Sequence, residues 1–292
     1  QQAKPEKRVE KQASTLPAPT EADVAYGPHP KQVLDFWKAP TGSKPGPLVL
    51  YIHGGGWRGG DRTHVGSILK PMLAAGVSVV SISYRFIPEA ENVQPPVMAP
   101  MRDAARALQT VRSRASAWGI DKTRIAAAGF SAGACTSLWL AFHDDLADPG
   151  SADPVAREST RVLAAAVGGA QTSLDPVQMK EWIPNIGYGG HAFGFASFDA
   201  FLAGRDKIVP WIQEYSPYAL VTPDDPPVHL WYRRAPAVGE KQADPTHSAN
   251  FGVKLQERLT AAGVKSELVH ADTQNPQHKT GVEFLLSVLK PD

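Results

Sequence analysis

Residues 124–133 read RIAAAGFSAG, and this stretch decides how the rest of the chain is interpreted. A short apolar run of strand character, 124–128, leads into the pattern Gly-x-Ser-x-Gly, and a segment of helical character begins at Ala132. Between a strand and a helix, this pattern is typical of a sharp turn that exposes a nucleophilic serine, here Ser131. The glycines allow the tight turn, and the helix N-terminus favours negative charge that develops at the serine. Taken alone, the pattern suits a serine N-cap equally well.

A second glycine motif, HGGGW at residues 53–57, follows an apolar strand predicted at 48–52. Glycines have no Cβ, so their main-chain N–H groups can approach a substrate oxygen closely. Acyl transfer needs such donors, because the carbonyl oxygen becomes an anion in the tetrahedral intermediate. We expect Gly55 and Gly56 to supply two donors and Ala132 a third. The two motifs together favour a catalytic serine beside an oxyanion hole over a flexible loop and a simple N-cap.

Outside these motifs, apolar runs alternate with longer amphipathic segments, which is typical of a mainly parallel sheet flanked by helices. Further strands are expected at 77–84, 162–170, 228–232 and 267–270, and helices at 98–118, 251–262 and 284–289. Residues 172–215 break the alternation with glycines and many aromatic side chains. This stretch is too long for a simple connection, and we expect an aromatic-rich insertion over the site, as a lid or pocket wall. A surface excursion with its own aromatic cluster is the alternative.

The length of 292 residues and an apolar content of 42% suit one large domain. Residues 1–22 are polar and contain prolines, so we expect a disordered spacer there and the domain at 23–292. A spacer of this kind, in a chain that begins with Gln1, favours export, to the periplasm or outside the cell. The single cysteine, Cys135, allows no intrachain disulfide.

Charge and motifs exclude several classes of partner. Thirty Lys and Arg residues balance 29 Asp and Glu residues, so no basic excess indicates nucleic-acid binding. The longest apolar runs have strand length, so no membrane span is expected. Neither a metal-binding motif nor a dinucleotide-binding glycine motif is present, and we therefore expect no metal and no cofactor.

The HGGGW motif followed by GFSAG resembles the hormone-sensitive-lipase and bacterial carboxylesterase branch of the α/β-hydrolases, near the polysaccharide acetyl and feruloyl esterases. The resemblance extends from about Gln32 to the C-terminus, and Tyr84-Arg85 and Ser216-Pro217 are further points of similarity. It implies an α/β-hydrolase fold and a catalytic triad in the chain order serine, acid, histidine.

The resemblance implies a catalytic histidine after the last strands. His278 lies there, ahead of the final predicted helix, and is therefore the expected base. His270 falls within the strand run itself, and His247 falls at the start of the preceding helix. His53 belongs to the glycine motif and is expected to support it.

The resemblance also implies an acid after the strand at 228–232. Asp244, in the segment ADPTHS, is the preferred candidate. Glu240 and Asp175 stay open as alternatives, because the segment 233–240 is longer than the family pattern. The acid is expected to orient the imidazole and to stabilise its protonated form.

These inferences favour a serine carboxylic-ester hydrolase that works through an acyl-enzyme. Short-chain or aromatic acyl esters, such as acetyl or feruloyl groups on glycans, are the expected small-molecule or glycan substrates. A lipase or polyester hydrolase, a serine peptidase and a catalytically inactive binding protein on the same fold are the alternatives. The sequence leaves the oligomeric state open.

Overall fold

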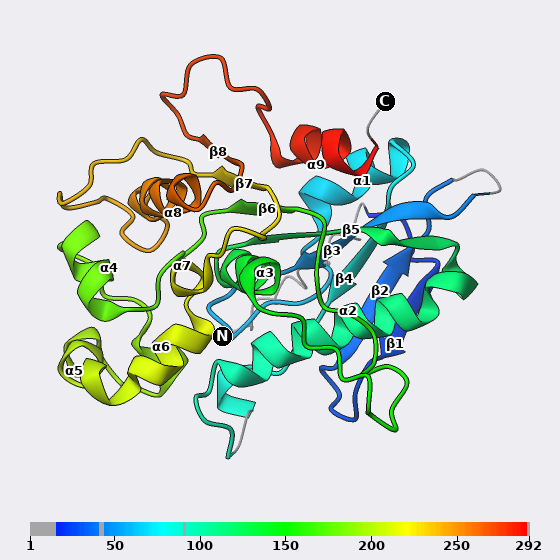
Figure 1. Ribbon diagram of the computed structural model, residues 1–292, viewed down its shortest axis with the longest axis horizontal. Helices are drawn as coiled ribbons and strands as arrows, with labels where there is room; N and C mark the ends of the chain where they lie inside the picture. The colour runs from blue at the N-terminus through cyan, green and yellow to red at the C-terminus, as the bar shows by residue number, and fades with distance from the viewer. Residues whose placement is uncertain (1–15, 41–43, 90–91, 291–292) are drawn as a thin grey trace, which may run out of the picture.

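The computed structural model describes residues 16–40, 44–89 and 92–290. Within these ranges the chain forms an eight-stranded sheet in the order β1-β2-β4-β3-β5-β6-β7-β8 (Figure 1). The strands are β1 (Glu21–Ala25), β2 (Val33–Trp37), β3 (Gly46–Ile52), β4 (Ser78–Ile82), β5 (Ile120–Phe130), β6 (Ala165–Gly168), β7 (Val228–Trp231) and β8 (Ser266–Val269). Pairings from β4 through β8 are parallel, whereas β2 runs antiparallel to both β1 and β4. The predicted mainly parallel sheet is therefore confirmed.

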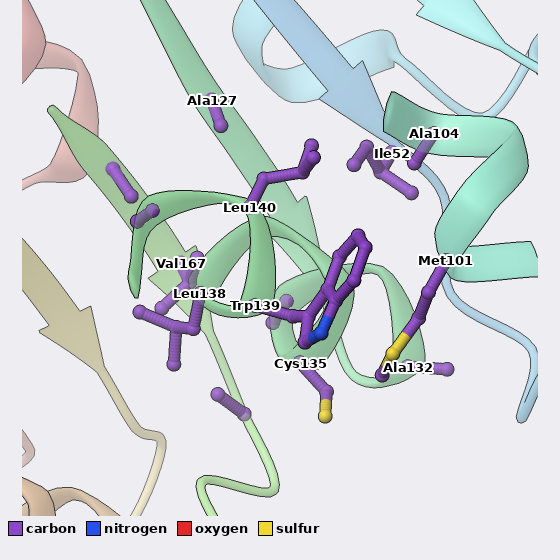
Figure 2. Close-up of a cluster of buried hydrophobic side chains, with 14 of the residues drawn as sticks. Ile52, Met101, Ala104, Ala127, Ala132, Cys135, Leu138, Trp139, Leu140 and Val167 are labelled. Atoms are coloured by element: carbon purple, nitrogen blue, oxygen red, sulfur yellow. The ribbon is translucent and has the colours of Figure 1, made fainter. Parts of the chain in front are cut away.

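Helices cover both faces of this sheet, as the near-continuous apolar strands require. On β3, Leu50 belongs to the core shared with helices α2 and α3, whereas the adjacent Val49 belongs to the core shared with α1 and α9. The helices are α1 (Gly66–Ala74), α2 (Met98–Trp118), α3 (Ala132–Phe142), α8 (Asn250–Ala261) and α9 (Gly281–Leu289). Figure 2 shows the indole of Trp139 on α3 lying near Ile52 and Met101. Trp139 thus packs in the core between α3, β3 and α2.

The segment between β6 and β7 contains α4 (Pro176–Trp182), η2 (Gly190–Phe193), α5 (Phe198–Ala203), η3 (Arg205–Ile208), α6 (Val209–Tyr215) and α7 (Pro217–Leu220). It includes the predicted insertion 172–215. Its aromatic side chains pack largely on one another: the ring centroids of Phe193 and Phe201 lie 5.7 Å apart, and those of Phe198 and Phe201 lie 6.0 Å apart. Phe193, Phe198 and Phe201 belong to the same buried cluster as side chains of α2 and α3, so the aromatic residues of the insertion extend the main core.

The N-terminal part of the domain begins earlier than expected. Residues 1–15 of the predicted spacer lie outside the described residues, but residues 16–20 lie against the sheet, and β1 begins at Glu21. The indole N–H of Trp37 donates to the Pro17 carbonyl at 2.9 Å, and the Thr20 N–H donates to the Phe36 carbonyl at 2.7 Å. The expected boundary at residue 22 is corrected accordingly. The β1 segment EADVA was missed because it is an edge strand in which only Val24 is buried.

Candidate active site

Ser131 occupies a strained turn between β5 and α3. Its backbone has φ 55° and ψ −122°, a conformation that residues with a Cβ seldom adopt. Close packing of the main chain holds this turn, because a Cβ on Gly133 would lie 2.1 Å from the Ile52 carbonyl oxygen. A Cβ on Gly129 would lie 2.5 Å from the Gly133 carbonyl oxygen. The two glycines of the motif are thus required by the close approach of β3, β5 and α3.

A histidine and an aspartate from the connection between β7 and α8 complete the group around Ser131. The Ser131 Oγ and His247 Nε2 atoms lie 3.0 Å apart. On the other side of the ring, His247 Nδ1 lies 3.0 Å from Asp244 Oδ2 and 3.2 Å from Asp244 Oδ1. An ionised carboxylate only accepts, so Nδ1 carries the proton and Nε2 is free to accept from the serine hydroxyl. This is the arrangement in which an imidazole can take a proton from serine.

The predicted pairing of Ser131 with His278 is corrected by this geometry. The ring Nδ1 of His278 lies 2.8 Å from Glu267 Oε1 on β8, and the His278 N–H donates to the same carboxylate at 3.2 Å. The connection from β8 to α9 therefore stays tied to the edge strand, and it loops outward in Figure 1. The sequence pattern placed His247 at the start of a helix, and it was therefore not chosen as the base. In the structure, α8 begins only at Asn250.

The three acid candidates have different surroundings. Asp244, the preferred candidate, contacts a histidine as expected, although that histidine is His247 and not His278. Asp175 is buried, caps α4 by accepting from the Val177 N–H, and pairs with Arg205 at 2.8 Å. Glu240 is exposed in a turn, where its main-chain carbonyl accepts from the Gln242 side chain. The spacing Asp-x-x-His was the sequence signal for the pair, because one turn of chain brings both side chains together.

The predicted oxyanion loop lies beside the serine. A Cβ on Gly54 would lie 3.3 Å from the Ser131 Cβ, so the loop touches the turn directly. Gly55 has φ +110° and Gly56 has φ +63°, and a Cβ on Gly55 would lie 2.1 Å from the Gly59 carbonyl oxygen. The positive φ angles of Gly55 and Gly56 and the close contact at Gly54 thus disfavour side chains where the loop approaches Ser131, and glycines there leave main-chain N–H groups accessible. Ala132, the third predicted donor, is the first residue of α3 and follows Ser131 directly.

Side chains from three directions hold this loop in place. His191, in η2 of the insertion, lies 3.0 Å through Nε2 from the Gly56 carbonyl oxygen, which can only accept. The indole N–H of Trp57 donates to Thr136 Oγ1 on α3 at 3.0 Å. The Tyr84 hydroxyl donates to the His53 carbonyl at 2.8 Å, and the two rings stack with centroids 4.3 Å apart. The part of the insertion around His191 therefore supports the glycine loop at residues 53–57.

We expect His191→Ala to lower kcat for a p-nitrophenyl ester by about ten- to a hundredfold while changing KM little. Without the hydrogen bond to its carbonyl, Gly56 can rotate and misplace the adjacent N–H groups, which matter most in the transition state. His191→Gln keeps an N–H donor and should recover part of the loss. His270→Ala, in the outward loop, is the matched control. A rise in KM with unchanged kcat would contradict the positioning role.

Burial lowers the pKa of His53 to about 4 and, likewise, the pKa of His191 to about 4, from an ordinary value of 6.5. Burial acts in the opposite sense on Asp225, whose pKa rises to about 6. A histidine with a lowered pKa binds its proton more readily in the unfolded chain. Its stabilising contribution is therefore complete above pH 6.5 and is lost as the pH falls towards 4.

Thermal unfolding should show this loss as a Tm that falls between pH 6.5 and pH 4. His53 and His191 each contribute on the order of 2–3 kcal/mol. Among the strongly shifted carboxylates in the described part of the chain, Asp225 alone opposes them. His191→Gln should make the fall in Tm shallower than in the unsubstituted protein. An equally steep fall in both proteins would count against the buried histidines as its cause.

Two clefts share the side chains of Phe130 and Trp231, which are 43% and 41% exposed, and His247 lines the smaller of the two. The larger cleft has a volume of about 570 Å³ and lies on the face of the sheet that α1 and α9 cover. The smaller, of about 360 Å³, is also lined by Gly169, Arg233, Arg234, Asp244 and His247. The Phe130 ring stacks on the His247 ring, with centroids 5.5 Å apart. Aromatic surface therefore borders His247 directly.

Groups of three or more side chains suited to hold a metal ion are absent from residues 16–40, 44–89 and 92–290. Over the same ranges, every helix is too short or too polar to cross a bilayer.

A mainly parallel sheet with this serine turn, and with a histidine and an aspartate after β7, defines the α/β-hydrolase class. Residues 34–244 match the family model described as BD-FAE, and the chain belongs to this family. The matched region includes the glycine loop, Ser131 and Asp244 and ends just before His247.

Solved structures confirm the α/β-hydrolase fold. An acetyl ester-xyloside bifunctional hydrolase from Caldicellulosiruptor lactoaceticus is 21% identical, with a TM-score of 0.61 over 88% of this chain and 83% of that one. Native esterase 2 from the planctomycete Thermogutta terrifontis is 20% identical, with a TM-score of 0.64 over 89% of each chain. At this level of identity, the likeness concerns the fold.

Among curated relatives, esterase LipC of Mycobacterium tuberculosis is 34% identical over 114 residues, and carboxylesterase NlhH of the same organism is 41% identical over 96 residues. These matches cover 38% and 32% of this chain. The chain spans about a quarter of the length of these relatives, 27% of LipC and 28% of NlhH.

Proposed function

We propose that this protein is a serine carboxylesterase. The observation that carries the proposal is the continuous hydrogen-bonded series from Ser131 through His247 to Asp244, with atom separations of 3.0 Å at both links. In this assignment, Ser131 is the nucleophile, His247 the general base and Asp244 the acid that orients the ring. The relatives named as esterases support the same activity.

The reaction proceeds in two halves. His247 Nε2 takes the hydroxyl proton as Ser131 Oγ bonds to the ester carbonyl carbon, and the carbonyl oxygen becomes an anion. The N–H groups of Gly55, Gly56 and Ala132 stabilise that anion. The intermediate collapses, the C–O bond to the alcohol breaks, and the protonated His247 donates its proton to the departing oxygen. Water then repeats the sequence on the acyl-enzyme and releases the carboxylic acid and free Ser131.

Short acyl groups on glycans are the substrates that we favour. The exposed rings of Trp231 and Phe130 beside His247 offer a flat apolar surface on which a sugar or an aromatic acyl group can stack. Structural neighbours described as an acetyl ester-xyloside hydrolase and as a carbohydrate esterase from gut microbiota support this choice. The aromatic rings of the insertion do not carry the argument, because Phe193 and Phe201 are buried against each other.

The test combines a covalent label with a substrate series. A fluorophosphonate probe should attach to Ser131, as located by peptide mass spectrometry, and should stop hydrolysis of p-nitrophenyl acetate. Acetyl and butyryl esters should be cleaved faster than esters of about ten carbons, a length that suits a lipase pocket. Absence of labelling would indicate an inactive binding protein. Faster cleavage of peptide anilides or of long-chain esters would instead favour a peptidase or a lipase.

A further inference from the structure

The smaller cleft beside His247 contains two arginines, and both are exposed. Within the part of the chain that the structure describes, Arg233 and Arg234 form neither an ion pair nor a hydrogen bond. Several other arginines have carboxylate partners, such as Arg85 with Asp103 at 2.6 Å and Arg161 with Asp224 at 2.8 Å, whereas Arg157 and Arg258, which lie outside the cleft, have none among the described residues. The cleft arginines thus retain all their donors for a ligand.

The fold places both guanidinium groups in one cleft. Consecutive side chains on a strand point to opposite sides, but the chain leaves β7 at Trp231 and bends at residues 233 and 234. The residue before the bend is firmly held, because Tyr232 is buried and its hydroxyl donates to the Ala170 carbonyl at 2.9 Å. Arg233 and Arg234 consequently extend from a fixed base.

The cleft has a local excess of positive charge although the whole chain is nearly neutral. Two guanidinium groups face a single lining carboxylate, that of Asp244, which gives a net charge of +1 with His247 neutral. Asp244 is engaged with His247 through both of its oxygens and lies in no ion pair with either arginine among the described residues. An anionic group entering the cleft would therefore meet unpaired donors and little repulsion.

We propose that the alcohol portion of the ester is a sugar carrying a carboxylate, as in a uronic-acid glycan, and that Arg233 and Arg234 bind this carboxylate. A guanidinium group presents a planar pair of donors that matches a planar carboxylate. Trp231, exposed in the same cleft, offers an apolar face to the sugar ring. The acyl group bound to that sugar then lies at Ser131. This inference rests on the proposed esterase function and narrows its substrate class.

The test compares acetylated polygalacturonate with acetylated cellulose, which lacks carboxylates. The unsubstituted protein should have the higher kcat/KM on acetylated polygalacturonate, and added salt should reduce that preference by screening. The double variant Arg233→Gln/Arg234→Gln should lose about tenfold or more on the acidic polymer. Its rate on p-nitrophenyl acetate, which has no carboxylate to bind, should stay within about twofold.

A matched control is the double variant Arg157→Gln/Arg258→Gln, which removes the same charge at exposed positions outside the cleft. It should keep the preference for the acidic polymer. An equal loss of activity in the control would show a general charge effect and overturn the proposal. Equal cleavage of methyl-esterified acetylated polygalacturonate, or a preference for sulfated glycans alone, would also overturn it. Failure to cleave p-nitrophenyl acetate at all would instead refute the esterase function itself.

Discussion

His247→Ala is expected to lower kcat/KM for p-nitrophenyl acetate by roughly four to six orders of magnitude, whereas His278→Ala should leave it within about threefold. The physical reason is the placement of the two rings. His247 Nε2 lies 3.0 Å from Ser131 Oγ, while the His278 ring is held by Glu267 at 2.8 Å on the edge strand. Steady-state kinetics of both variants over several pH values is the measurement.

The comparison of these two histidines also tests the tertiary arrangement. Both substitutions remove an imidazole from a partly exposed position next to a carboxylate, so each serves as the other's control. Asp244→Asn should follow His247→Ala with a smaller loss of about 10⁴-fold, because a neutral amide no longer holds the required tautomer. If His278→Ala abolished esterase activity and His247→Ala retained it, the assignment of His247 as the base would be wrong.

Ser131→Ala should abolish turnover, with a loss on the order of a millionfold, and should leave the fold intact. The alanine retains a Cβ, so the strained backbone with φ 55° is unchanged, and the side chain loses only its oxygen. The measurement pairs hydrolysis of p-nitrophenyl acetate with thermal unfolding, in which Tm should shift by only a few degrees.

Ser137→Ala is the control on the same helix. Its hydroxyl donates to the Gly133 carbonyl at 2.8 Å inside α3 and forms no hydrogen bond with His247 among the described residues. This variant should retain activity and fluorophosphonate labelling, both of which Ser131→Ala should lose. Residual activity above about one per cent in Ser131→Ala would remove Ser131 from the nucleophile role, since a triad member typically contributes far more.

Most of the helices and strands could be predicted from local sequence patterns. The helix predicted at 98–118 is α2, which spans Met98–Trp118, and its end is set by Gly119 in the left-handed conformation. The polar edge strand β1 was not predicted, because a strand with one buried side chain lacks the apolar pattern of the central strands. Strand β2, VLDFW, was not predicted either, although four of its five residues are buried, because Asp35 interrupts its apolar run.

The amino-acid composition also gave no indication of the local charge of the cleft. A net charge of +1 for the chain gave no reason to expect anionic substrates, yet Arg233 and Arg234 line one cleft at the carboxyl end of β7. A total charge averages over the surface, whereas binding depends on the few groups within reach of the ligand. Only the bend after Trp231 brings these two side chains to the same side.

By itself, the sequence determined the fold class, the turn that holds Ser131 and the glycine loop at 53–57, because each depends on apolar periodicity or on glycines within a few residues. It also indicated Asp244. The tertiary structure decided which histidine faces the serine. That choice depends on the paths of two connections: the one after β7 brings His247 to 3.0 Å from Ser131, and the one after β8 is tied by Glu267 to the sheet edge. Such paths are set by contacts between distant segments, which no local pattern records.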